Sequence, residues 1–385
     1  MKKSILAIVI AVMMVAACAI GISAGRCDSA FAAANFSLIK EYTEADLGTK
    51  TMRAFCVDPN GKYYFGGNLH GGPTMYKFDA KTGDMLGSYQ FTVDEGSYIK
   101  GLGADDRGYV YNGIANAAND GAFFFSILNM DTMEEQSYVE VKIEGKLGVN
   151  GIGVANVGGT YYCYVMTNYD TDRLYRFDVT DVKAPKMDTT FGEGGYIDMA
   201  AKYSFDDCNG VGVDTNGYIY VTGLKQGGEG KADTFMKLNA DGSLVEEVAL
   251  ANGWNVEVFD DEYVVVSTRG GADSKVYVID SDVMEPIAEF APTADAQGFS
   301  GAGIMNNKIY VCDHGDPDRV FVSDAFAITE KAAEVETTAE EVVDAVVTDT
   351  AVSDTTTAPK TFDAAIIAAV AAVVSAAGYM VSKKH

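Results

Sequence analysis

The stretch Gly210-Val211-Gly212-Val213-Asp214-Thr215-Asn216-Gly217-Tyr218-Ile219-Tyr220-Val221 decides the fold of this 385-residue chain. It reads as a small and apolar run, a polar turn that ends in glycine, and an aromatic run. Alternating runs of this length, interrupted by Asn, Asp and Gly, are typical of two antiparallel strands joined by a tight turn. The stretch therefore predicts a β-hairpin.

The same pattern recurs along the chain. Clear copies begin at Ala54, Gly101 and Gly151, and degenerate copies surround Asp260 and Asn306. The turns of the six copies fall at Gly61, Gly108, Gly159, Gly217, Glu262 and Asn307, with spacings of 47, 51, 58, 45 and 45 residues. A period of this length indicates a repeat architecture.

Each unit continues with further strand-like runs. A third run follows a loop in five units, at 75–79, 174–178, 235–239, 276–280 and 320–324. A fourth run usually comes next, as at Met85–Phe91 and at 286–290. Four antiparallel strands per unit, repeated radially, predict an all-β fold: a six-bladed β-propeller over residues 35–328.

The last unit has three runs before the composition changes. A fourth is available at the other end of the chain, where Phe36–Tyr42 looks like the outer strands of the other units. An open propeller would expose a sheet edge. We therefore expect this N-terminal run to pair with unit six and close the ring.

The units resemble the blades of the NHL and SMP-30-like six-bladed propeller families. The segments 210–223 and 313–322 carry this resemblance best, while Asp79–Gly83 looks more like a quinoprotein-type blade. Those families include binding scaffolds, lactonases and lyases. The resemblance thus implies the fold and leaves the function open.

The N-terminal segment 1–34 has the features of a secretory signal peptide. Lys2 and Lys3 precede an apolar run from residue 5 to about residue 22, and an A-x-A site follows at 30–34. Cleavage is expected after Ala32 or Ala34. The stretch Val15–Cys18 also resembles a bacterial lipobox, although apolar sequence continues beyond it.

The C-terminal segment 361–385 is predicted to be an anchor. An uncharged stretch, 364–381, is followed by Lys383 and Lys384. With Pro359 and Thr361 before it, the order resembles the sorting signal of Gram-positive surface proteins, which implies that sortase joins Thr361 to peptidoglycan. Ala358 and Phe362 stand where the usual L-P-x-T-G motif has Leu and Gly, so a plain transmembrane helix is the alternative. The Thr-rich acidic segment 329–360 is predicted to be a disordered spacer.

Charge and composition narrow the partners and cofactors. The net charge of −26 argues against nucleic acid as a partner, because binding it needs a cationic surface. Three His residues and the lack of a C-x-x-C spacing make a zinc site improbable, so no cofactor is expected. Acidic pairs at 105–106, 206–207 and 260–261 leave Ca²⁺ open, although acidic turns explain them equally well.

Two histidines are candidates for catalysis. His70 and His314 occupy loops between the second and third strands of units one and six, which are neighbours in a closed ring. With the carboxylates of the 313–318 loop they could bind a metal or perform acid–base chemistry. The alternative is that both are loop residues without a shared site.

Residues that open the innermost strands are candidates for ligand binding. They are polar, and two are cationic: Arg53, Lys100, Asn150, Asn209, Asn255 and Ser300. Trp254, Asp316 and Arg319 lie beside them on the same loop face. This set suits a small anionic or hydroxylated ligand such as a glycan, although a hydrated channel mouth also needs polar residues. Trp254 could instead pack between blades, and Arg319 could instead start the third strand.

Three hypotheses follow for the function. The first is a monomeric propeller, anchored to the surface of a Gram-positive-type bacterium, that binds an extracellular glycan or protein through its loop face. The second is an extracellular lyase or hydrolase, and the third is a structural surface component without a specific ligand. The four cysteines of the predicted propeller (Cys56, Cys163, Cys208 and Cys312) are expected to be buried thiols, with one disulfide as the alternative.

Overall fold

A computed structural model describes residues 34–48, 52–68, 72–92, 97–227, 230–315 and 318–326. The predicted signal peptide, spacer and sorting signal lie outside these residues, apart from Ala34. Within the described ranges, no helix has the length and apolar character needed to cross a membrane.

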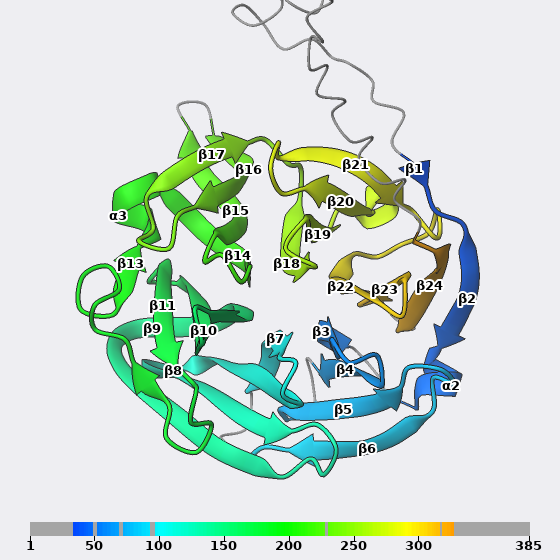
Figure 1. The fold of residues 1–385 in the computed structure, drawn as a ribbon, viewed down its shortest axis with the longest axis horizontal. Coiled ribbons are helices and arrows are strands. Elements are labelled where there is room, and N and C mark those ends of the chain that lie inside the picture. Colours follow the sequence, from blue (N-terminus) through cyan, green and yellow to red (C-terminus); the bar gives the residue numbers. More distant parts are fainter. Residues whose placement is uncertain are drawn as a thin grey trace, which may run out of the picture. The chain divides into compact units, whose positions relative to one another are not determined.

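Six blades surround a common axis, as predicted (Figure 1). Blade 1 contains β3 (Met52–Val57), β4 (Tyr63–Asn68), β5 (Thr74–Asp79) and β6 (Met85–Gln90). Blade 4 contains β14 (Phe205–Val213), β15 (Ile219–Gly227), β16 (Gly230–Leu238) and β17 (Leu244–Val248). Blade 5 contains β18 (Gly253–Phe259), β19 (Tyr263–Thr268), β20 (Val276–Asp280) and β21 (Glu285–Phe290). In each blade the first strand lies innermost (Figure 1).

Blades 2 and 3 share long strands, which the sequence pattern did not indicate. They are built from β7 (Tyr98–Ala104), β8 (Tyr109–Asn129), β9 (Glu135–Val157), β10 (Thr160–Tyr169), β11 (Arg173–Asp178), β12 (Lys186–Met187) and β13 (Tyr196–Asp198). β8 provides both the second and third strands of blade 2, and β9 runs from blade 2 into blade 3. Shifts of register between Asn116 and Ala122 disturb the pairing of β8 where a loop is expected.

The N-terminal strand closes the ring. In blade 6, β22 (Phe299–Met305), β23 (Lys308–Asp313) and β24 (Arg319–Ala325) are followed by β2 (Leu38–Thr43), which pairs antiparallel with β24. The predicted closure is confirmed, with Tyr42 opposite Val320. An additional contact was not expected: β1 (Ala34–Asn35) pairs parallel with β21 of blade 5.

Turns between first and second strands explain many of the acidic residues. Asp58 and Asp105 accept backbone N–H groups two and four residues further on, and the turn glycines Gly61 and Gly108 have φ of 78° and 89°. A carboxylate that satisfies backbone donors in this way fixes the turn. These acidic residues are therefore part of the scaffold.

The four cysteines of the propeller are buried and unpaired. Burial raises the pKa of each thiol. They behave as small apolar residues of the core.

Candidate functional site: the basic mouth of the propeller

Every innermost strand has a one-residue bulge near its start. The bulge appears as a shift in the pairing with the second strand, for example between Met52 and Ala54 or between Ile99 and Gly101. The same shift occurs in the four other blades. The residues at this position form a ring: Arg53, Lys100, Asn150, Asn209, Trp254 and Ser300.

The strand pairing corrects one member of the predicted ring. Gly253 pairs with Thr268 and Val256 with Val266, as Cys208 pairs with Gly223 and Val211 with Val221 in blade 4. Trp254 is therefore the equivalent of Asn209, and Asn255 is the equivalent of Gly210. Blade 5 has Asn255 where blades 2, 3, 4 and 6 have glycine and blade 1 has Ala54, so the alignment made from the sequence alone was shifted by one residue.

Three cationic side chains surround the indole ring of Trp254. The Arg269 guanidinium lies 4.2 Å from the ring centroid, Lys100 Nζ 5.4 Å and the Arg53 guanidinium 5.6 Å. Lys100 Nζ also lies 5.2 Å from the ring of Tyr169. These distances allow cation–π attraction. We call this cluster of Arg53, Lys100, Arg269 and Trp254 the basic mouth.

The basic mouth carries positive charge that nearby carboxylates do not neutralise by contact. None of its three cations forms a salt bridge with a described residue, although the Asp207 carboxylate is close enough to favour charged Lys100. Burial and the charge of Arg53 lower the pKa of Lys100 to about 7. The same two causes lower the pKa of Arg269 to about 10. Buried cations this close together repel one another, and an anion bound among them would relieve that repulsion.

His314 orients Arg269. Its Nδ1 lies 2.7 Å from the carbonyl oxygen of Gly298, which can accept but cannot donate, so this nitrogen carries the proton. Nε2 then accepts from the Arg269 guanidinium. Burial and the charge of Arg269 lower the pKa of His314. Both ring nitrogens are engaged, so His314 is poorly placed to act as a free base.

Arg319 supports this arrangement from behind. It forms salt bridges with Asp313 at 2.7 Å and with Asp295 at 2.8 Å. The buried Asp313 carboxylate in turn accepts the N–H of Gly298 at 2.9 Å. Arg319 therefore fixes the loop whose carbonyl holds His314. His70 and Asp316, the other candidates from these loops, lie outside the described residues.

The ring asparagines join neighbouring blades and leave acceptors unused. Asn150 Nδ2 donates to the Cys208 carbonyl at 2.7 Å, and Asn209 Nδ2 donates to the Gly253 carbonyl at 3.1 Å. The Oδ1 atoms of Asn150, Asn209 and Asn255 are buried and have no hydrogen-bond partner among the described residues. Ser300 Oγ lies 3.4 Å from the carbonyl of Cys312 in the same blade. Unused buried acceptors are rare in proteins and suit a ligand or water that donates.

A cavity of about 250 Å³ opens beside the basic mouth. Its lining includes Trp254, Arg269, Asn209, Asp207 and Gln297. The volume is enough for a small molecule or one sugar residue. The cavity therefore brings a ligand directly against the indole and one guanidinium.

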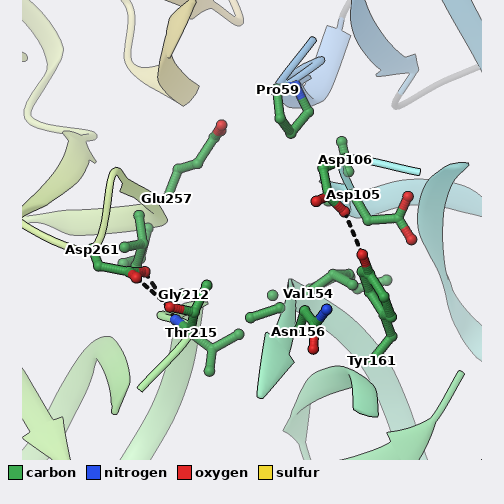
Figure 2. Close-up of a pocket in the computed structure, with 18 of the residues that line it drawn as sticks. Pro59, Asp105, Asp106, Val154, Asn156, Tyr161, Gly212, Thr215, Glu257 and Asp261 are labelled. Carbon is green, nitrogen blue, oxygen red and sulfur yellow. Dashed lines mark hydrogen bonds between the residues drawn. The ribbon is translucent and has the colours of Figure 1, made fainter. Parts of the chain in front are cut away.

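The opposite end of the inner strands has a different character. A cavity of about 370 Å³ there is lined by Asp105, Asp106, Glu257, Asp260 and Asp261, among others. Figure 2 shows the Glu257 side chain extended into it. The neighbouring carboxylates are already bonded: Asp106 accepts from Tyr161 at 2.8 Å, and Asp261 accepts from the Thr215 N–H at 2.9 Å. We call this end the acidic mouth.

The acidic pairs do not assemble into a cation site in the part of the chain that the structure describes. No three His, Cys, Asp or Glu side chains in these ranges are grouped so that they could hold a metal ion. Asp105, for example, is paired with Arg107 at 2.7 Å.

Sequence reasoning missed Arg269, Asp207 and Tyr169 at the basic mouth. Arg269 directly follows β19, in a loop between second and third strands. His314 occupies the equivalent loop of blade 6, directly after β23. Applying the same loop rule to unit five would have identified Arg269. Asp207 and Tyr169 had no comparable signal, because only the folded ring brings them near Lys100.

Comparison with known proteins shows likeness in fold alone. No protein-family model matches the chain, and no curated protein matches it. Solved structures that resemble it at low identity include a luciferin-regenerating enzyme, which is 13% identical over 74% of this chain and 94% of that one, with a TM-score of 0.49. The WD40 domain of Neurospora crassa Pan2 is 10% identical over 77% of this chain and 97% of that one, with a TM-score of 0.45. The β-propeller domain of Myceliophteria thermophila Cps50 (Swd1) is 9% identical over 74% of this chain and 99% of that one, with a TM-score of 0.44. The strand pairing itself establishes that this chain is a six-bladed β-propeller.

Proposed function

We propose that the protein is a surface-anchored propeller that binds an acidic extracellular glycan at the basic mouth. One observation carries this proposal: three cations surround Trp254 without a salt bridge to any described residue, in a chain of net charge −26. The excess of acidic residues elsewhere repels anions, so a local basic site stands out as a place for one.

The chemistry of the basic mouth matches a sugar acid at each point. Guanidinium groups bind carboxylate or sulfate oxygens through paired N–H donors. The indole of Trp254 offers a flat apolar face beside them. The unused Oδ1 atoms of Asn150 and Asn209 can accept hydrogen bonds from sugar hydroxyls. A neutral glycan would leave the cations unpaired, and a simple inorganic anion would leave the acceptors unused.

The ends of the chain support display at a cell surface. A signal peptide at 1–34, a self-repelling spacer at 329–360 and a Pro359-x-Thr361 sorting signal would carry an NHL-like propeller beyond the wall of a Gram-positive-type bacterium. Digesting the wall should release the protein, whereas detergent should not. Release by detergent alone would instead indicate a transmembrane helix at 364–381.

Intrinsic fluorescence gives a direct test of binding, because Trp254 is the sole tryptophan of the chain. Titration with carboxylated or sulfated oligosaccharides should change its emission and saturate, and neutral oligosaccharides of the same length should not. The R53Q/R269Q variant should lose most of this response. K142Q is the matched control, because Lys142 is an 81% exposed cation on the outer strand of blade 2. Equal response to neutral and acidic sugars would overturn the proposal.

An enzyme that uses His314 as its base has less support. The Nε2 atom that would take a proton already faces the Arg269 guanidinium, and burial disfavours the charged imidazolium. A structural surface component without a ligand has less support as well, because that role would not explain why three cations gather at the basic mouth without a salt bridge to a described residue.

A further inference from the structure

Three of the lysines whose burial the structure describes are buried, and two of them join blades. Lys77 and Lys237 are each 7% exposed, and Lys100 is 6% exposed. Lys77 Nζ donates to the carbonyls of Met130 and Asp131, at 2.9 and 2.8 Å. Lys237 Nζ donates to the carbonyl of Ser281 at 2.7 Å. In both cases Nζ donates hydrogen bonds to carbonyl oxygens of the next blade.

Lys100 has no such acceptor. Its Nζ makes no hydrogen bond and no salt bridge with any residue in the described ranges, and two guanidinium groups, those of Arg53 and Arg269, repel its charge. The rings of Trp254 and Tyr169 flank the amine at 5.4 and 5.2 Å. The nearby Asp207 carboxylate favours the ammonium form. A buried lysine beside other cations is the arrangement that turns an amine into a nucleophile at neutral pH.

The cavity at the basic mouth supplies the other half of a reaction site. Trp254 and Arg269 line it. Lys100 and Arg53 are not among the lining residues, but they lie beside the same indole, at 5.4 and 5.6 Å from its ring centroid. A carboxylate held by the two guanidinium groups would place the rest of a short molecule near Lys100. The cavity volume of about 250 Å³ limits that molecule to a few carbon atoms or one sugar ring.

We propose that Lys100 forms an imine with the carbonyl group of a small oxo acid whose carboxylate is bound by Arg53 and Arg269. The proposal rests on the anion-binding role of the basic mouth and names a ligand class for it, since a reducing sugar acid also presents an aldehyde. Lys77 and Lys237 are excluded from this chemistry because their Nζ atoms are held by hydrogen bonds to carbonyl oxygens of the next blade.

The bonds balance without a further reactant. The lone pair of neutral Nζ attacks the carbonyl carbon, and the carbonyl oxygen becomes a hydroxyl by taking a proton that nitrogen loses. The C–O bond of this carbinolamine then breaks, a second nitrogen proton leaves with the oxygen as water, and a C=N bond remains. One amine and one carbonyl thus give one imine and one water. Cyanoborohydride, added as the hydride donor, reduces the imine to a stable secondary amine.

Reductive trapping tests the inference on the full chain. Glyoxylate with cyanoborohydride at pH 7 is followed by peptide mapping, which compares modification rates at individual lysines. Lys100 should react at least about tenfold faster than Lys142, because fewer than about one in a thousand ordinary lysines is neutral at this pH. Lys77 and Lys237 should be slower than Lys142. In R53Q/R269Q the rate at Lys100 should fall and should no longer saturate with glyoxylate.

A second measurement separates this inference from the binding proposal. Titration of Trp254 fluorescence with acidic sugars, carried out on the same unmodified protein without cyanoborohydride, reports anion binding alone. Reaction of Lys100 no faster than Lys142, in protein whose Trp254 responds to acidic sugars, would overturn the imine and leave the anion site standing. The same slow reaction without any fluorescence response would overturn both.

Discussion

The carboxyl group of Glu257 occupies the space that Gly303 leaves by having no side chain. A Cβ atom on Gly303 would lie 2.6 Å from Glu257 Oε2 and 2.6 Å from Val57 Cγ2. Glu257 thus reaches from blade 5 past blade 6 and accepts a hydrogen bond from the Val57 N–H of blade 1. This one side chain connects three blades at the acidic mouth.

The same position is glycine in most other blades. Strand pairing aligns Glu257 with a layer of glycines, each opposite a buried tyrosine: Gly103 and Tyr111, Gly153 and Tyr164, Gly212 and Tyr220, Gly303 and Tyr310. In blade 5 the pair is Glu257 and Val265. A larger residue on the first strand therefore coincides with a smaller one on the second. In blade 5, Glu257 thus takes the place of the glycine and Val265 takes the place of the tyrosine.

Gly303→Ala should destabilise the propeller by about 1–3 kcal/mol, because the added methyl group overpacks a filled space. Chemical denaturation of the variant measures this loss. Gly87→Ala is the matched control, because nothing lies within 4 Å of a Cβ on this outer-strand glycine. Its stability should stay the same or rise slightly. An equal loss in the two variants would contradict the close contact with Glu257.

Glu257→Gln should stabilise the protein at alkaline pH and have little effect near pH 4. Burial raises the pKa of Glu257 to about 8, so the folded protein keeps this carboxyl protonated where the unfolded chain ionises it. The wild type therefore loses stability between about pH 4.5 and 8, and glutamine loses none. The difference in free energy of unfolding should grow to a few kcal/mol above pH 8. Thermal melts at pH 4 and 9 check this, and a constant difference would contradict the raised pKa.

The fold was predictable because one period governs the whole propeller. The turn positions and the third-strand runs predicted six blades. The missing fourth strand of the last unit predicted closure by Phe36–Tyr42. The pattern erred where a blade departs from it. β8 continues through the turn signal at 119–121, where only its register shifts. Blade 5 has Asn255 and Glu257 where most other blades have glycine. One of these departures, Asn255, directly follows Trp254 of the candidate site.

The candidate site was predictable in part. Arg53, Lys100 and Asn209 follow from repeat equivalence alone. Their meeting with Arg269 on the ring of Trp254 does not, because it depends on the direction of long side chains across the axis. The basic residues in the third strands, Lys77 and Lys237, were visible in the sequence and proved to join blades.

Tyr42→Ala should cost about 3–5 kcal/mol of stability, because Tyr42 packs the closing strand against the core of blade 1. Its side chain is 4% exposed. Ile39→Ala on the same strand is the control: Ile39 is 51% exposed and should change stability by less than about 0.5 kcal/mol. Urea denaturation of both variants compares them. Similar small losses for both would mean that β2 contributes little to ring closure.

The affinity of the basic mouth for anions should fall as pH rises through about 7. Burial and Arg53 lower the pKa of Lys100 to about 7, so this residue gives up its charge there while the two arginines keep theirs. Loss of one of three cations should weaken binding several-fold, and bound anion should shift the midpoint upward because it favours the ammonium. Fluorescence titrations of Trp254 between pH 6 and 9 measure the effect. Lys100→Met should bind weakly at every pH and lose the dependence, whereas Lys142→Gln should follow the wild type. A pH dependence that persists in Lys100→Met would assign the titration to another group and leave Lys100 outside the anion site.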